Sequence, residues 1–225
     1  MLLQSHAQAV VGPDALVDVA TASFGAPYIS CEASYAVAGH ATLDAWARAM
    51  GQDAAPHDAV LIGCFGDPGL FALREASSAP VTGLAEAAMS EAAQQGRFAI
   101  VTGGALWKPM LQRLAFSLGF AEVLGGILTV APTGAQLAND PVAAKALLAD
   151  ACQQAIDQFK AKAIVLGGAG LAGLAAQIQP GLSVPVIDSV SAGVLHAVAL
   201  ASKATRAPRQ HPGRLEEIKP WLGIR

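Results

Sequence analysis

The amino-acid sequence predicts an α/β protein made of two similar three-layer lobes, each with a mainly parallel sheet between helices. Three observations support this fold class. Short apolar runs alternate along the chain with Ala-rich helical patterns. A Gly-rich stretch in the first half of the chain recurs in the second half. Of the 225 residues, 53% are hydrophobic and only 14% are charged, which indicates an extensive buried surface.

The expected strands are short runs bounded by Gly, Pro or polar residues. Several are apolar throughout, as in a parallel sheet that is covered on both faces. They lie at Leu16–Ala22, Ala59–Gly63, Pro80–Gly83, Phe98–Gly103, Gly125–Val130, Ala163–Gly167 and Val184–Asp188. Helical patterns lie at Leu2–Val11, Ala41–Met50, Leu84–Gln95, Pro109–Leu118, Pro141–Phe159 and Val190–Ser202. Strands that alternate with helices predict βαβ units.

An internal repeat predicts how the units are grouped. Residues 58–66 (DAVLIGCFG) align without a gap with residues 162–170 (KAIVLGGAG), and residues 79–87 echo 184–192 one position out of phase. Two related halves predict two lobes about a pseudo-two-fold axis, with the Gly-rich strand ends facing each other across a cleft. We assign residues 1–83 with 190–225 to the first lobe and 84–189 to the second. Ligands of such sheets bind at these carboxyl ends of strands.

Composition excludes several classes of function. The net charge is −3 and the Lys and Arg residues form no basic stripe, which argues against a nucleic-acid partner. No stretch approaches the roughly 18 apolar residues of a membrane span, and the first residues lack the pattern of a signal peptide. We therefore expect a cytoplasmic protein with a small-molecule substrate, and the low charge content suggests a homo-oligomer.

Cysteine and histidine usage gives no sign of a metal site. The three cysteines have unrelated spacings and form neither a disulfide framework nor a metal cluster, which is typical of a reducing compartment. The five histidines show no zinc-binding spacing. We expect no metal and no cofactor.

Cys64 is the strongest candidate for chemistry. It follows a predicted strand and is bordered by glycines, so a substrate can reach it. Neighbouring backbone N–H groups can lower its pKa from the free value of about 8.5, which would make it a usable acid or base. The alternative is that Cys64 is a small buried hydrophobe. Cys152 in a helix and Cys31 after a loop are predicted to be structural.

The second Gly-rich stretch allows a rival interpretation. Gly168, Gly170 and Gly173 follow a strand, and Asp188 ends the next one, as in a dinucleotide-binding fingerprint. Against it, Pro180 leaves only a short helix after the glycines, and the repeat explains the same glycines without a nucleotide.

A third strand-to-helix turn is the segment Thr102-Gly103-Gly104. Its hydroxyl and N–H groups at the start of a helix are suited to a carboxylate or imide oxygen. A turn that is merely tight is the alternative.

The chain resembles the aspartate/glutamate racemase superfamily, and within it the hydantoin and allantoin racemase branch. The resemblance covers nearly the whole chain and rests on the segments FGAPYIS, HDAVLIGCFGDPGL, FAIVTGGALWKPML, AIVLGGAGLAG and VPVIDSVSAGV. It implies two α/β lobes with the site between them and no cofactor. It also implies a mechanism in which one thiolate removes the proton next to a carbonyl, a second cysteine returns one on the opposite face, and N–H groups hold the enolate oxygen.

By this resemblance Cys64 takes the first thiol position, and Gly168 stands where the second catalytic thiol is expected. The implied substrate-binding residues are Phe65 and Gly66 at the oxyanion pocket, Thr102, Gly103 and Gly104 at another substrate oxygen, and Ala169 and Gly170 on the opposite wall.

Two departures from the family leave three functions open. Glycine can neither accept nor donate a side-chain proton, and the family's opening strand with its Asn-Pro-Asn type of turn has no counterpart. The first hypothesis is a hydantoin-racemase-like enzyme with Cys64 as acid and base. The second is a decarboxylase or tautomerase similar to the arylmalonate decarboxylases, in which a single thiol protonates an enolate. The third is a catalytically silent protein that binds a carboxylate or imide.

Overall fold

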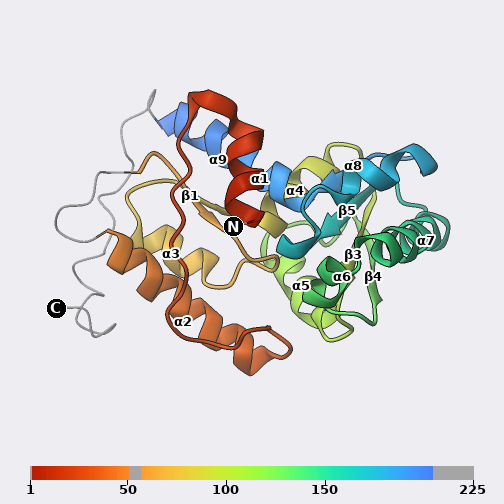
Figure 1. The fold of residues 1–225 in the computed structure, drawn as a ribbon, viewed down its shortest axis with the longest axis horizontal. Coiled ribbons are helices and arrows are strands. Elements are labelled where there is room, and N and C mark those ends of the chain that lie inside the picture. The colour runs from red at the N-terminus through yellow and green to blue at the C-terminus, as the bar shows by residue number, and fades with distance from the viewer. Residues whose placement is uncertain (1, 51–56, 205–225) are drawn as a thin grey trace.

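The computed structural model describes residues 2–50 and 57–204, and Figure 1 shows how their elements are arranged. The strands are β1 (Val60–Ile62), β2 (Val81–Gly83), β3 (Phe98–Gly103), β4 (Leu124–Val130), β5 (Ala163–Gly167) and β6 (Val186–Asp188). The α-helices are α1 (Leu2–Val11), α2 (Glu32–Ala49), α3 (Leu70–Ala76), α4 (Leu84–Ala93), α5 (Trp107–Ser117), α6 (Gly134–Asn139), α7 (Pro141–Phe159), α8 (Leu174–Ile178) and α9 (Ser189–Ala204). One sheet pairs β1 with β2, and the other has the order β4-β3-β5-β6.

The four-stranded sheet lies between two layers of helices. Phe98 and Ile100 of β3 pack with α4 and α5, whereas the alternate residues Ala99 and Val101 pack with α7 and α8. Side chains of a strand point to opposite faces in turn, so a strand with both sets buried must be covered twice. Every strand pair in both sheets is parallel. The predicted α/β class with mainly parallel sheets is therefore confirmed.

The two-stranded sheet carries the first Gly-rich stretch. Ile62 and Val81 pack with α2 and α3 on one face. On the other face Leu61 reaches Gly193 of α9, which also contacts Leu84 of α4. Helix α4 packs on α9 and on β5, so it lies between the two sheets. The predicted lobe boundaries stay a proposal.

The predicted strand at Leu16–Ala22 is wrong. The segment has no strand structure, and Leu16 is 85% exposed. A period-two pattern forms a strand only where a neighbouring strand accepts and donates its backbone hydrogen bonds, and none does so among the residues that the structure describes.

Helices α2, α3 and α6 also differ from prediction, and no helix was expected at α6. Helix α2 begins at Glu32, well before the expected Ala41, because Gly39 in its middle weakened the helical pattern. Gly39 is needed there since an added Cβ would lie 3.3 Å from the backbone nitrogen of Gly69. Helix α3 was not predicted and follows Gly69, whose φ of 83° is a glycine conformation.

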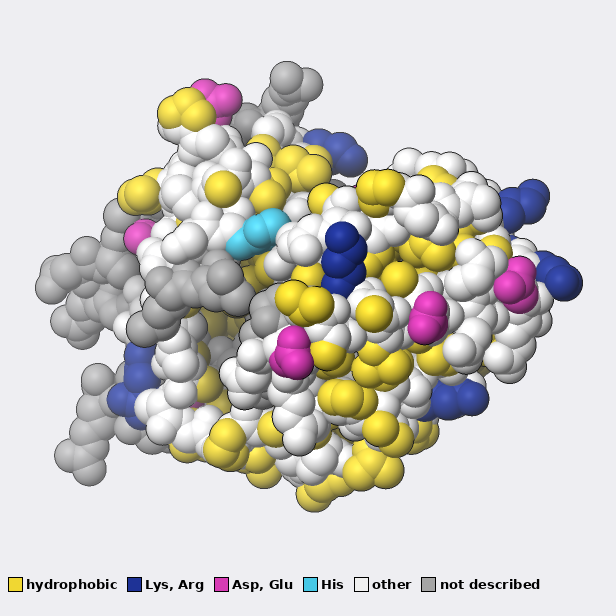
Figure 2. Space-filling model, turned by 45° about the vertical axis from the view of Figure 1, so that its right-hand side comes forward, with side chains coloured by type: hydrophobic (Ala, Val, Ile, Leu, Met, Phe, Trp, Pro, Cys, Tyr) yellow, Lys and Arg dark blue, Asp and Glu magenta, His cyan; other side chains and the backbone are white. Residues whose placement is uncertain are grey.

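The surface agrees with the expected absence of a basic stripe. On the face drawn in Figure 2, Lys and Arg side chains stand apart from one another, with apolar side chains between them. Within the described ranges, no helix is both long and apolar enough to cross a bilayer.

Candidate active site

Cys64 lies in a tight turn directly after β1. The N–H of Asp67 donates to the Cys64 carbonyl oxygen at 3.0 Å, and the turn uses positive φ angles at Gly66 (113°) and Asp67 (52°). The thiol is half-buried. Burial, and then the charge of Asp67, raise the pKa of Cys64 to about 12. The expected lowering by backbone N–H groups is not found, because burial penalises the thiolate more than these dipoles favour it.

The second Gly-rich strand end faces this turn. A side chain at Gly167 would overlap the ring of Phe65, so the residue next to the thiol lies directly on the end of β5. The hydroxyl of Thr102 donates to the Gly167 carbonyl at 2.7 Å and fixes β5 beside β3. The two strand ends that the repeat paired thus meet in space.

Gly168 adopts a backbone conformation suited to glycine. Its φ is 147°, and a Cβ there would lie 3.2 Å from Cγ of Leu171. Its N–H donates to the hydroxyl of Ser189 at 3.2 Å. Ala169 and Gly170 follow in a short 3-10 turn and are half-buried. The position expected for a second thiol therefore has no side chain, and its backbone has a φ angle that residues with side chains rarely adopt.

Aromatic side chains that the sequence analysis did not select surround the Cys64 turn. The Trp107 ring lies against Gly66, and the Tyr35 hydroxyl donates to the Gly66 carbonyl at 2.6 Å. Tyr35 and Trp107 stack edge to face with centroids 6.5 Å apart, and the Tyr28 hydroxyl lies against Gly104. Gly66 and Gly104 are glycines because these rings occupy the space of a side chain.

The Thr102-Gly103-Gly104 turn is engaged within the fold. The Thr102 hydroxyl is bonded to Gly167, as described above, and the N–H of Gly104 donates to the Val130 carbonyl at 2.8 Å. The expected free hydroxyl and the Gly104 N–H are thus occupied. A contact of this turn with substrate stays a prediction.

The Asp188 carboxylate accepts hydrogen bonds from backbone N–H groups, which argues against the nucleotide interpretation. Its Oδ1 accepts from the N–H groups of Val190 and Ser191, and its Oδ2 accepts from Gly173 at 2.6 Å. The carboxylate that would bind a ribose is therefore used to cap α9. The helix after the glycines, α8, has only five residues.

The two remaining cysteines differ in exposure, and one groove borders the Cys64 turn. Cys152 is buried in the core as predicted, whereas Cys31 is exposed at the start of α2. A groove of about 270 Å³ is lined by Tyr35 and Asp67, which also bond to the Cys64 turn. Among the described residues, no three His, Cys, Asp or Glu side chains cluster as metal ligands.

Comparison with known proteins identifies the family. A profile of the Asp/Glu/hydantoin racemase family matches residues 2–197. The chain belongs to this family. A hydantoin racemase from Pseudomonas sp. (strain NS671) is 35% identical over 74% of this chain and 67% of its own length. A hydantoin racemase from Paenarthrobacter aurescens is 33% identical over 96% of this chain and 91% of its own.

Solved structures agree with this membership. Allantoin racemase from Klebsiella pneumoniae superimposes with a TM-score of 0.84 at 32% identity, covering 95% of this chain and 86% of its own. Such relatives place the chain among isomerases of the racemase type, as the sequence predicted.

Proposed function

We propose that this member of the Asp/Glu/hydantoin racemase family is a cofactor-independent isomerase of the hydantoin-racemase type that uses Cys64 as acid and base. Its substrate would be a hydantoin, an amino acid or a related carboxylate or imide with an acidic C–H next to a carbonyl. The observation that carries the proposal is the half-buried Cys64 in a Gly-rich turn at the end of β1, where the next residue, Phe65, packs on the end of β5. A cytoplasmic location and a homo-oligomeric state belong to the same proposal.

The proton transfer has two halves. The Cys64 thiolate takes the proton from the carbon, and the C–H electron pair becomes part of an enolate. The thiol then returns a proton to that carbon. N–H groups of the turn at Phe65 and Gly66 are suited to the enolate oxygen, because donors fixed in a water-poor site stabilise developing charge without reorganising.

Gly168 determines the stereochemical outcome. A single thiol returns the proton to the face from which it came, and glycine has no group that donates to the other face. We infer that water protonates the opposite face of the enolate, and that the hydroxide left behind takes the proton from the Cys64 thiol. Exchange of the acidic hydrogen with retained configuration should therefore be faster than inversion.

The test is proton NMR in D₂O with single enantiomers of 5-substituted hydantoins, allantoin, aspartate and glutamate. We expect deuterium to enter at the acidic carbon of at least one of them, and Cys64→Ala to abolish that entry. Wild-type exchange in Cys64→Ser or Cys64→Ala would contradict the role of the thiol. Saturable binding without exchange would favour a silent binding protein.

A single-thiol decarboxylase is the second candidate, and the high pKa of Cys64 favours it because the resting group is then a proton donor. In this reaction the bond between the α-carbon of a malonate and one carboxylate breaks, CO₂ leaves, and the enolate takes the thiol proton; water then reprotonates the thiolate. Release of CO₂ from an arylmalonate with optically pure product would support it. A racemic product would argue against it.

A further inference from the structure

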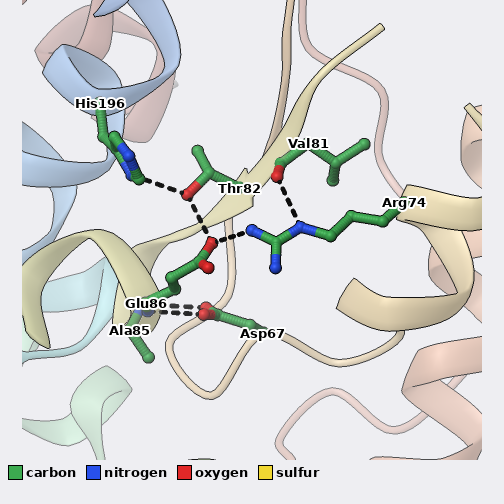
Figure 3. A network of polar contacts seen from close by, with 7 residues as sticks. All are labelled: Asp67, Arg74, Val81, Thr82, Ala85, Glu86 and His196. Atoms are coloured by element: carbon green, nitrogen blue, oxygen red, sulfur yellow. Dashed lines mark hydrogen bonds and ion pairs between the residues drawn. The ribbon is translucent and has the colours of Figure 1, made fainter. Parts of the chain in front are cut away.

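Asp67 lies three residues after Cys64 and is almost completely buried. Its carboxylate faces the beginning of α4 (Figure 3), where Oδ1 accepts from the N–H of Ala85 at 2.9 Å and Oδ2 from that of Glu86 at 2.7 Å. N–H groups in the first turn of a helix have no partner within the helix. Asp67 therefore caps a helix that is distant in sequence.

Gly83 makes this long-range cap possible. It occupies the N-cap position of α4 and has no side chain to perform the capping itself. A side chain at Gly83 would overlap the Asp67 carboxylate. The two residues are thus complementary: Gly83 leaves the space free, and Asp67 fills it with the carboxylate that accepts from the helix N–H groups.

The second half of the chain reverses this arrangement. Alignment of the two Pro-initiated strands places Gly83 opposite Asp188, and the two capped N–H groups opposite Val190 and Ser191. Asp188 caps α9 locally and reaches across to Gly173 in the second Gly-rich loop. Both halves tie a loop to a helix through one carboxylate. Only in the first half does that carboxylate belong to the loop, and only that loop carries a thiol.

The carboxylate is set in a polar network that connects three further elements. Glu86 pairs with Arg74 of α3 and accepts from the Thr82 hydroxyl at 2.9 Å; that hydroxyl is 3.1 Å from Nδ1 of His196 on α9 (Figure 3). Arg74 also donates to the Val81 carbonyl at 3.0 Å. The Asp67 carboxylate is thus bonded to a helix turn that is itself held by hydrogen bonds and an ion pair to neighbouring elements.

The ionisable groups around Asp67 act in different directions. Burial, and to a smaller extent Glu86, raise the pKa of Asp67, while the two N–H donors and Arg74 lower it; the result is about 7. Burial, and then the Asp67 charge, raise the pKa of Cys64 in the same loop and that of Tyr35 on α2.

We propose that Asp67 is a positioning residue for Cys64, which ties the thiol loop to the first turn of α4 and places a buried carboxylate three residues from the thiol. The loop is then held from two sides. The Asp67 carboxylate accepts from an N–H of α4, and the Tyr35 hydroxyl donates to the Gly66 carbonyl. The negative charge opposes a thiolate, so Cys64 rests as a proton donor. The role of Asp67 in catalysis rests on the proposed function of Cys64, but the first test needs no substrate.

The test measures how fast iodoacetamide alkylates Cys64 as a function of pH. The background is Cys31→Ser, which removes the exposed thiol, and peptide mapping locates the label. We expect Asp67→Asn to increase the alkylation rate several-fold at a fixed pH between roughly 8 and 9, because loss of the carboxylate charge lowers the pKa of Cys64 and so raises the thiolate fraction. Asp140→Asn, which changes an exposed carboxylate that caps α7, is the matched control and should leave the rate unchanged.

A second variant covers the case in which Asp67→Asn does not fold. Asp67→Ala with Gly83→Ser gives α4 a local, neutral cap in the space that the carboxylate leaves. Circular dichroism establishes which variants fold. A wild-type alkylation profile in either folded variant would overturn the proposal.

Activity separates this proposal from the proposed function. We expect D₂O exchange in the folded Asp67 variants to be slower and its pH profile to move to lower pH. Faster alkylation with unchanged exchange would overturn the positioning role. Exchange that survives in Cys64→Ala would instead reject the proposed function, and the alkylation result would stand by itself.

Discussion

At the scale of single residues, the site depends on a thiol that is protonated at rest. Burial, and then the charge of Asp67, raise the pKa of Cys64 to about 12, so the thiol form dominates at pH 7. A thiol in this state carries a proton that it can give to the more basic enolate. Its rare thiolate is a stronger base than that of a free cysteine, which suits removal of a proton from carbon.

The first prediction concerns this thiol. Cys64→Ala should lower the rate of exchange at the acidic carbon by about 10² to 10⁴, the usual contribution of a positioned acid or base. Cys31→Ser is the matched control, since Cys31 is exposed and serine can replace it at the start of α2. Exchange rates by NMR in D₂O check both, and an equal loss in the control would contradict the assignment.

The second prediction concerns Asp67 and pH. Its pKa is about 7 in the folded protein and about 3.9 in an unfolded chain, so protonation favours the folded state. The free energy of unfolding that Asp67 contributes is complete below about pH 4 and is lost as pH rises to 7. The loss is at most roughly 4 kcal/mol.

Urea unfolding at several pH values checks this sign. Asp67→Asn cannot ionise, so the difference in stability between wild type and variant should favour wild type most at pH 4 and least at pH 8. A difference that grows with pH would mean that the buried carboxylate is stabilised as an anion.

The third prediction concerns Gly168→Cys. The φ of 147° is rarely adopted by a residue with a side chain, so the variant should lose about 1–3 kcal/mol of stability by thermal or urea unfolding. Where it folds, inversion should become faster relative to exchange, because a donor now stands on the second face. Unchanged stability would show that the backbone relaxes without cost.

At the scale of elements, the helix caps determine how the Gly-rich loops are held. Helix α4 is capped by Asp67 and α9 by Asp188, and each carboxylate also fixes the loop beside the site. Each carboxylate therefore links a loop to a helix. A change at a cap should disturb the site even though the helix itself makes no contact with substrate.

The fourth prediction tests the cap of α4. Gly83→Ala should push the Asp67 carboxylate from the two N–H groups and lower the free energy of unfolding by roughly 2 kcal/mol or more, since buried donors are left unpaired. Gly181→Ala, where an added Cβ meets nothing within 4 Å, is the control and should change stability by about 0.5 kcal/mol at most. Denaturant midpoints of the two variants check this.

Strands β3 and β5 were predictable because they are buried on both faces. Such strands read as continuous apolar runs, and β3 and β5 were placed correctly for that reason. The Leu16–Ala22 segment shows the limit, because a strand pattern without a neighbouring strand forms no strand. The internal repeat predicted the meeting of the Cys64 turn with Gly167.

The contacts across the site were not predictable from local patterns. Tyr28, Tyr35 and Trp107 reach it only through tertiary packing on glycines. Asp67 lies within the motif that carried the family resemblance, yet its partners on α4 are far away in sequence. A glycine at the N-cap of a helix, as at Gly83, is the one local signal of a carboxylate supplied from elsewhere.

At the scale of the whole molecule, two related halves meet at the site, and they carry different chemical groups there. The Phe65 ring on Gly167 joins the two sheets at their carboxyl ends. The first half brings a thiol and a buried carboxylate to this junction, whereas the second brings a glycine in a conformation that residues with side chains rarely adopt. The account therefore predicts proton transfer that is efficient on one face of the substrate.

The most direct test compares exchange with inversion for one enantiomer of a 5-substituted hydantoin in D₂O. Deuterium incorporation is followed by NMR, and configuration by chiral chromatography of the same samples. The account predicts that deuterium enters several times faster than configuration is lost, and that neither occurs in Cys64→Ala. Inversion at the same rate as exchange would show a second proton donor opposite Cys64 and would contradict the account.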